Sequence, residues 1–92
     1  MSKFAVGSVF KTCGIEIAMD EDKKYIDEIV DCLSRYLAGD WGNLSEDDKI
    51  ANDKALTNNE RLLGAYQTSK GKVYIITEWD RKITTILFAH EY

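Results

Sequence analysis

The chain has 92 residues, of which 45% are hydrophobic, and its formal net charge is −4. A chain this short forms one domain, residues 1–92, because each half of a divided chain would bury too little apolar surface to stay folded. The hydrophobic fraction is that of a globular protein and excludes a disordered chain. The negative charge disfavours direct binding to nucleic acid, which relies on neutralising phosphates with lysine and arginine.

No window approaches the roughly 18 apolar residues of a transmembrane helix. Lysine and glycine interrupt the apolar positions of the first nineteen residues, so no signal-peptide core is present. We therefore expect a cytoplasmic protein that makes no contact with a membrane. The only cysteines, Cys13 and Cys32, form no CxxC pair, and we expect both thiols to be reduced and buried.

The N-terminal segment predicts a first strand. Residues 4–12 combine two phenylalanines and two valines around a glycine, which is typical of a strand with a bulge. Residues 14–19 fit either a continuation of this strand or a short helical turn. Ile15 and Ile17 alternate there, but the segment is too short for its period to decide.

Residues 22–37 predict the clearest helix, because apolar side chains recur every three or four residues and form one stripe. The stripe consists of Tyr25, Ile26, Ile29, Val30, Leu33, Tyr36 and Leu37. Three acidic residues, 20–22, lie at its N-terminus, where the helix dipole favours negative charge. Gly39 follows its end, in the usual place of a terminating glycine.

Residues 46–56 predict a second helix. Ser45 precedes it as N-cap, and Asp48 three residues later completes a pattern that resembles a capping box. The apolar residues that this helix could bury are Ile50, Ala51, Ala55 and Leu56. With so few, the helix should be short, peripheral and largely solvated, and residues 57–59 should end it.

Three segments, residues 61–68, 73–77 and 82–88, predict strands joined by short turns, which forces antiparallel neighbours. We therefore predict an α+β fold: a three- to four-stranded antiparallel sheet, made of this C-terminal meander and the N-terminal strand, with two helices on one face. Alternation places apolar side chains on both faces of the sheet. The second face would be covered by the first strand, by the second helix or by a partner chain.

The last strand, ITTILF, predicts a homodimer. It is β-prone and almost uncharged, and a strand of this kind needs cover if it forms the edge of a sheet.

The charge of the chain is uneven. Residues 20–53 hold eleven acidic and four basic residues, a net charge of −7. The acidic helices therefore suit a basic surface on a protein partner, since complementary charge steers such encounters. A more specific form of this hypothesis is that the acidic helices imitate DNA phosphates and occupy a basic groove in a defence or restriction protein.

A catalytic hypothesis would start from His90, the only histidine, with Glu91, Asp80 and Arg81 as companions in a small nuclease. Histidine titrates near neutral pH and can act as a general acid or base. However, His90 lies near the end of the chain, where side chains are rarely well positioned. We therefore expect no catalytic residue.

The acidic residues of the second helix could also suggest a metal site. Carboxylate and amide oxygens suit Mg²⁺ or Ca²⁺, and the candidates are Asp47, Asp48, Asn52 and Asp53. Their spacing is not that of an EF-hand loop, and stabilisation by the helix dipole explains acids at a helix start. The chain also lacks a phosphate-binding glycine loop, so we expect neither a metal nor a cofactor.

Trp41 and Trp79 each lie in a polar turn beside an aspartate. Either could fold back and close one end of the core, its indole N–H bonded to a carbonyl or carboxylate. Either could instead be an exposed binding residue, because tryptophan and arginine dominate interface energies. Trp79, Asp80 and Arg81 would then form a contact patch. A further alternative has Trp41, Trp79 and Arg81 line a pocket for a nucleotide or other small ligand.

The C-terminal part of the chain carries an ordered series of short motifs. They are GDWG at 39–42, DD at 47–48, AND at 51–53, AL at 55–56, RLL at 61–63, AY at 65–66, IITE at 75–78, DR at 80–81, TTIL at 84–87 and EY at 91–92. This series resembles a family of small uncharacterised proteins of bacterial phages, plasmids and conjugative elements. Some members carry the label of a type I restriction enzyme modification subunit, but the chain has no motif of the cofactor-binding domain such a subunit needs. The resemblance implies a mobile-element accessory protein.

These observations predict a non-enzymatic protein-binding module, acting on a host defence or restriction protein through its acidic helices. The candidate binding residues are Trp41, Trp79, Asp80, Arg81, Asp47 and Asp48.

Overall fold

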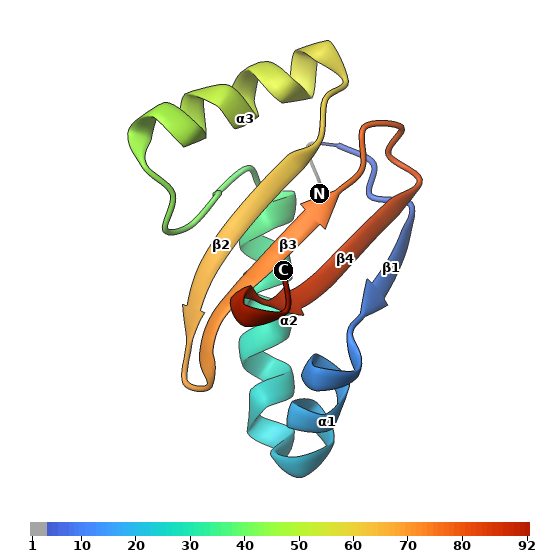
Figure 1. Ribbon diagram of the computed structural model, residues 1–92, viewed down its shortest axis with the longest axis vertical. Helices are drawn as coiled ribbons and strands as arrows, with labels where there is room; N and C mark the ends of the chain where they lie inside the picture. Colours follow the sequence, from blue (N-terminus) through green and yellow to red (C-terminus); the bar gives the residue numbers. More distant parts are fainter. Residues whose placement is uncertain (1–3) are drawn as a thin grey trace.

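The structure is a computed structural model that describes residues 4–92 (Figure 1). Its elements are β1 (Ser8–Lys11), α1 (Cys13–Glu21), α2 (Lys23–Leu37), α3 (Glu46–Asn58), β2 (Leu62–Thr68), β3 (Gly71–Thr77), β4 (Ile83–Phe88) and the 3-10 turn η1 (Ala89–Glu91). The strands form one sheet in the order β1-β4-β3-β2. The predicted α+β class is confirmed.

β1 differs from the predicted first strand in length and direction. It is parallel to β4, whereas β2, β3 and β4 form the expected antiparallel meander. It begins only after Gly7, whose φ is +63° and whose backbone lies so close to Lys82 that a Cβ would sit 2.2 Å from its carbonyl oxygen. A positive φ and this close approach interrupt the strand that residues 4–12 predicted.

The ambiguous segment after β1 is helical. Thr12 is the N-cap of α1, since its hydroxyl accepts a hydrogen bond from the N–H of Ile15. Ile15 and Ala18 are buried, while Ile17 points to solvent. The alternation of Ile15 and Ile17 therefore did not indicate a strand, and the structure has one helix more than we predicted.

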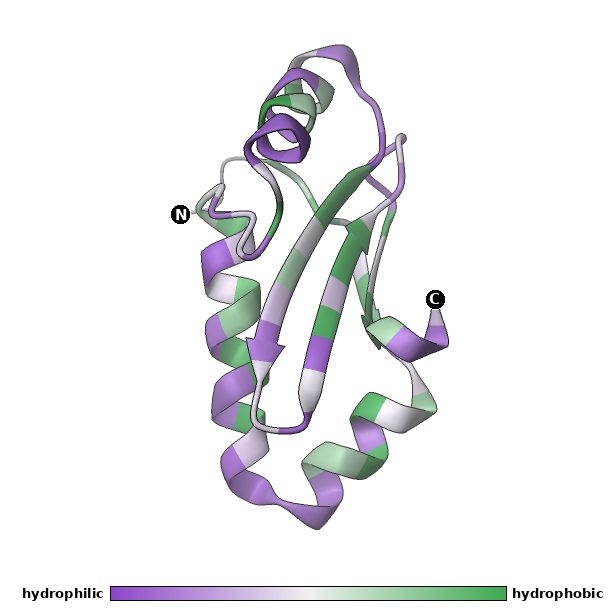
Figure 2. Cartoon of the chain, turned by 60° about the vertical axis from the view of Figure 1, so that its left-hand side comes forward, coloured by the Kyte–Doolittle hydropathy of each residue, from purple (hydrophilic) through white to green (hydrophobic). Residues whose placement is uncertain are grey.

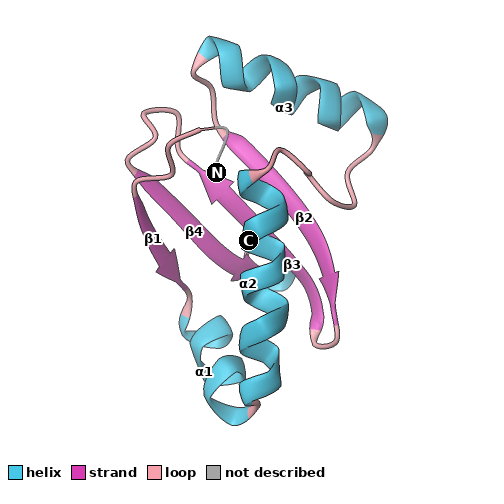
Figure 3. Cartoon of the chain, turned by 180° about the vertical axis from the view of Figure 1, so that it is seen from behind, coloured by secondary structure: helices cyan, strands magenta, loops and turns pink. Residues whose placement is uncertain are grey.

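α2 crosses one face of the sheet (Figure 3), and the core lies between this helix and the strands. Gly39, with φ +84°, follows its end, as the sequence predicted. Asp22, which we expected to begin the helix, is its N-cap, because its side chain accepts a hydrogen bond from the N–H of Lys24. Its fully or nearly buried side chains are Tyr25, Ile29, Cys32 and Tyr36. Each large apolar side chain buried in this way contributes about 1.5–3 kcal/mol.

A chain of hydroxyl groups runs through this core. Tyr36 donates to Thr77 Oγ1 at 2.7 Å, Thr77 and Thr84 share a hydrogen bond of 2.7 Å, and Thr84 donates to the carbonyl of Val6 at 2.8 Å. Burial raises the pKa of Tyr36 to about 12, so the phenol stays protonated. The chain joins α2 to β3, β4 and the N-terminal segment.

The opposite face of the sheet is partly covered by the C-terminal turn η1 (Figure 2). The ring of Tyr92 meets Tyr74 of β3 edge-on at 5.7 Å, and Arg61 donates to the Tyr92 hydroxyl at 3.1 Å. Neither the first strand nor the second helix covers this face. The C-terminal residues were not among the coverings that the sequence suggested.

The β2 edge is closed by hydrogen bonds from α3 and from the loop before it. The side-chain amide of Asn52 donates to the carbonyl of Leu63 and accepts from its N–H, as a neighbouring strand would. Ala65 is bonded in the same way by the backbones of Trp41 and Asn43. These contacts satisfy backbone groups that an edge strand normally exposes.

The structure removes the basis for the predicted homodimer. β4, the strand ITTILF, lies between β1 and β3 and is not an edge. The sheet places β1 and β2 at its edges instead.

We predict that Asn52→Ala lowers the free energy of unfolding by about 1–3 kcal/mol, because it leaves the N–H and C=O of Leu63 unbonded beneath α3. Asn58→Ala, at the exposed end of the same helix, is the matched control and should change stability by less than about 0.5 kcal/mol. Urea unfolding of the three proteins measures both values. Equal stability of the two variants would contradict the closing role of Asn52.

Candidate functional site

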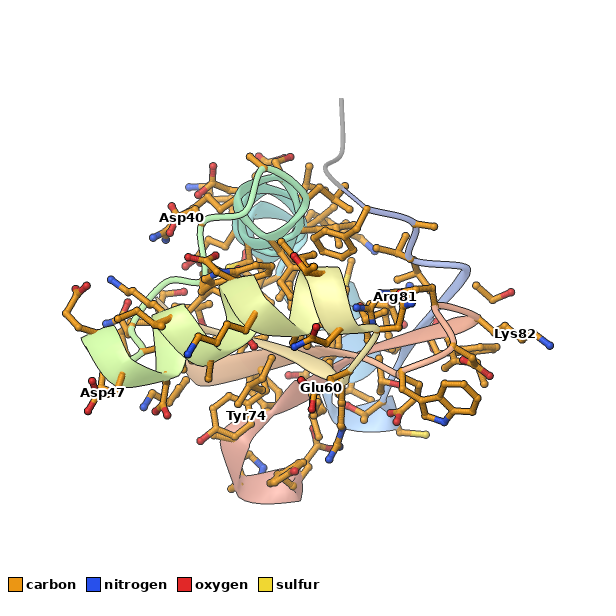
Figure 4. The ribbon with its side chains drawn as sticks, turned by 90° about the horizontal axis from the view of Figure 1, so that it is seen from above. Asp40, Asp47, Glu60, Tyr74, Arg81 and Lys82 are labelled. Atoms are coloured by element: carbon orange, nitrogen blue, oxygen red, sulfur yellow. The ribbon has the colours of Figure 1, made fainter. Side chains whose placement is uncertain are left out.

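The six predicted binding residues lie at three separate places. Trp41 is in the core, Asp47 and Asp48 are in the first turn of α3, and Trp79, Asp80 and Arg81 are in the β3–β4 turn. Figure 4 shows Asp47 and Arg81 near opposite ends of α3. The six residues therefore do not form one site.

Trp41 is a core residue that is only 3% exposed. Its ring packs against Tyr36 at 5.5 Å and Phe4 at 5.9 Å, and its Nε1–H donates to Asp53 of α3 at 3.0 Å. This is the core-closing alternative, with a carboxylate as the partner of the indole. The interpretation of Trp41 as an exposed binding residue is wrong, because the indole is needed to attach α3 to the core.

Asp47 and Asp48 are exposed at the start of α3. The N–H of Asp48 donates to the hydroxyl of Ser45 at 3.2 Å, which confirms Ser45 as the N-cap. Both carboxylates lie where the helix dipole favours negative charge. Much of this helix has the colour of hydrophilic residues in Figure 2, and its acids can attract a basic partner without forming a defined pocket.

The third place is the turn that joins β3 to β4, residues 78–82, which we call the tryptophan turn. Trp79 is 66% exposed there. The backbone around it is well bonded: the N–H of Glu78 donates to Ile83, that of Arg81 to Glu78, and that of Lys82 to the Asp80 carboxylate, at 2.9 to 3.1 Å. The turn therefore presents the indole to solvent from a hydrogen-bonded backbone.

Arg81 fixes the tryptophan turn to the end of α3. Its φ is +61°, a left-handed conformation that is unfavourable for a residue with a Cβ. Its guanidinium donates to the carbonyls of Ala55 at 3.0 Å, Glu60 at 2.6 Å and Glu78 at 3.2 Å. These bonds compensate for the backbone strain, and they occupy the guanidinium. Arg81 therefore positions Trp79 and is not a free member of the predicted contact patch.

Exposed apolar side chains extend from the tryptophan turn along β4 and β1. The N–H of Ser8 donates to the carbonyl of Lys82 at 3.0 Å, so β1 begins directly beside the turn. In the register of the two strands Ser8 is opposite Ile83, and Phe10 is opposite Thr85. Ile83 and Phe10 therefore lie on the same face of the sheet, and both are exposed.

The residues of the catalytic hypothesis are not brought together. His90 lies in η1, after the last residue of β4, whereas Asp80 and Arg81 lie before its first. A strand of this length separates the two ends by about 20 Å. The His90 ring stacks on the Phe88 ring at 5.4 Å. The Glu91 carboxylate accepts a hydrogen bond from the N–H of Phe88, and this bond lowers the pKa of Glu91. Two of the three expected companions, Asp80 and Arg81, are therefore absent from the surroundings of the histidine, and the third, Glu91, accepts hydrogen bonds from Thr12 and Phe88.

The pocket alternative also fails, because Trp41 is in the core and the Arg81 guanidinium is bonded to carbonyls. No pocket is found in the described part of the chain, and no group of metal-binding side chains occurs within residues 4–92. Asn52 and Asp53, which the metal hypothesis named, bond to Leu63 and Trp41 instead.

The two cysteines have different surroundings. Both thiols are free; Cys32 is buried, as predicted, and burial raises its pKa. Cys13 is exposed at the start of α1, so the expectation that both are buried is wrong for this one. Among the helices that the structure describes, none is long and apolar enough to span a membrane.

The chain has no significant match to a family model, a curated protein or a solved structure. The resemblance of residues 39–92 to proteins of mobile elements therefore stays a prediction.

We predict that Arg81→Ala and Arg81→Gly both lower the free energy of unfolding by about 1–3 kcal/mol, because both lose the bonds to the carbonyls. The glycine variant should be the more stable of the two by about 1 kcal/mol, since glycine tolerates the positive φ. Arg61→Ala is the control: the exposed Arg61 pairs with Glu78 at 3.8 Å and donates to the Tyr92 hydroxyl at 3.1 Å. Because both contacts are exposed to solvent, their loss should change stability by less than about 1 kcal/mol. Urea unfolding in which Arg81→Ala equals Arg61→Ala would contradict the anchoring role.

Proposed function

We propose that the protein is a protein-binding module that contacts its partner through Trp79. The observation that carries the proposal is the exposed indole on a turn that several hydrogen bonds hold in place. A tryptophan in contact with water is unfavourable for the isolated protein, and Arg81 holds it there in a strained backbone.

The rigidity of the turn supports binding to a protein. Ordering a flexible loop on binding costs free energy that reduces affinity, and a turn already fixed by its own hydrogen bonds avoids that cost. Tryptophan is the residue type most enriched at the energetic centres of protein interfaces. Ile83 and Phe10 continue the apolar surface beside the turn and would exclude water around the indole.

The acidic helices support a partner with a basic surface. Asp27 and Asp31 are exposed on α2, and Asp47 and Asp48 on α3. Charges outside the contact surface mainly raise the rate of association, by steering the partner toward the protein. With the resemblance of residues 39–92 to mobile-element proteins, this favours a basic host protein, such as one of defence or restriction, as the partner.

Trp79→Ala tests the proposal. The immobilised wild-type protein should capture a host protein from bacterial lysate at low salt, and Trp79→Ala should bind the purified partner about 30-fold more weakly, the loss of a central interface residue. Ile50→Ala is the matched control, because Ile50 is 52% exposed on α3, away from the turn, and should bind as the wild type does. Both variants should unfold at the wild-type urea concentration, since neither side chain is buried.

Two outcomes would contradict the proposal. In the first, the wild-type protein captures no partner. In the second, Trp79→Ala binds the captured partner as tightly as Ile50→Ala does.

The effect of the acidic residues of α3 on the association rate can be measured separately. Replacing Asp47 and Asp48 with asparagine should slow association by several-fold at low salt and leave the dissociation rate unchanged, because the two carboxylates act at a distance. Stopped-flow or surface-binding kinetics measure both rates. An unchanged association rate would show that the acids of α3 play no part in the encounter.

A further inference from the structure

The two edges of the sheet are unequal. On the β2 edge, Leu63 and Ala65 are bonded by Asn52 and by the segment that contains Trp41 and Asn43. On the β1 edge, all four residues are exposed, and no other described segment is paired with the outer side of the strand. Figure 1 shows β1 as the outermost strand, on the side of the sheet away from α3.

The backbone bonds show which groups of β1 point outward. The N–H of Ser8 donates to Lys82 and that of Thr12 donates to Ile86, so the even-numbered residues of this segment face β4. Residues alternate in direction along a strand, and Val9 and Lys11 therefore direct their N–H and C=O groups away from the sheet. The edge offers two donors and two acceptors.

The length of this edge is limited at both ends. Gly7 bends the chain before β1 with its positive φ, and α1 begins at Cys13. A long strand of another protein would leave backbone groups without partners beyond these limits. A strand that also presents only two outward residues would match it fully.

We infer that β1 pairs with β1 of a second copy of this chain, antiparallel, about a two-fold axis at Phe10. In this register Val9 of one copy exchanges both backbone bonds with Lys11 of the other, and Lys11 with Val9, so that every outward group of both strands is satisfied. The result is a continuous sheet through two molecules. The inference rests on the backbone of β1, and it shares only Phe10 with the contact surface proposed around Trp79.

The side chains suit this register. Phe10 would face Phe10 of the second copy, as a pair without mutual backbone bonds, where side chains approach most closely. Phe10 is 54% exposed and lies on the same face as Ile83, so the pair would remove both rings from water. Lys11 is the only charged residue of β1 and would lie opposite Val9, not opposite another lysine. Residues 1–19 have a net charge of +1, and the acids of residues 20–53 lie outside this strand.

Sedimentation velocity over a concentration range tests the self-association. A contact this small should give a weak dimer that forms at about 100 µM. Val9→Pro removes an outward N–H without disturbing the bonds to β4, and Phe10→Glu places two carboxylates together at the axis. Each should raise the dissociation constant at least about tenfold, and Ile50→Glu, a matched charge on α3, should not.

A disulfide tests the register itself. With Cys13 replaced by serine, Phe10→Cys should form a dimer under mild oxidation, because opposed Cα atoms about 4.5 Å apart lie within the range of a disulfide. Val9→Cys should cross-link much less, since its opposite residue is Lys11. Cys32 is buried and stays in both proteins.

Three results would overturn the inference. The wild-type protein could remain monomeric at several hundred micromolar. The dimer could persist unchanged in folded Val9→Pro and Phe10→Glu. Position 9 could cross-link as well as position 10. If Val9→Pro instead weakened binding of the heterologous partner to a monomeric protein, the edge would accept a strand of that partner and not a second copy.

Discussion

The attachment of α3 to the sheet is the constraint on which the rest of the structure depends. This helix has few apolar side chains, and its buried residues are only Asn52 and Ala55. Hydrophobic burial alone cannot hold it, and it is fastened by polar contacts: Asn52 to Leu63, Asp53 to Trp41, and the carbonyl of Ala55 to Arg81. These bonds close one edge of the sheet and fix the tryptophan turn.

The same constraint makes the molecule asymmetric. Because α3 and the loop before it bond Leu63 and Ala65, most of the β2 edge is covered, whereas no described segment is paired with the outer side of β1. Because Arg81 bonds to the end of α3, the conformation that exposes Trp79 persists as long as α3 stays attached. Four of the exposed large apolar side chains, Val9, Phe10, Trp79 and Ile83, lie at the turn and along β1 and β4. The others are on the three helices and at the C-terminus.

Periodicity and local turn chemistry predicted much of this fold. The apolar stripe of residues 22–37 defined α2, the serine before α3 defined its cap, and the short turns defined the antiparallel meander. The direction of β1 could not be predicted. Its partner β4 is distant in sequence, and the alternation of apolar and polar side chains is the same in parallel and antiparallel strands. The bonds of Asn52 to Leu63 left no signal in a single sequence either, since an asparagine in a polar helix is typical of a solvated face. For the site, the sequence identified the tryptophan turn, but it could not tell Trp41 from Trp79, since both stand beside an aspartate.

The residues behind the family resemblance have structural tasks in this chain. Trp41, Asn52 and Asp53 attach α3, and Arg81 joins it to the tryptophan turn. Gly42 lies so close to β2 that a Cβ would be 2.0 Å from the carbonyl oxygen of Ala65. Several members of the motif series therefore lie in the contacts that hold a polar helix against a sheet edge. Trp79 falls between IITE and DR, in a gap of the series, and Phe10 lies before its first motif. If binding depends on these two residues, the choice of partner is a property of side chains that lie outside the motifs of the predicted resemblance.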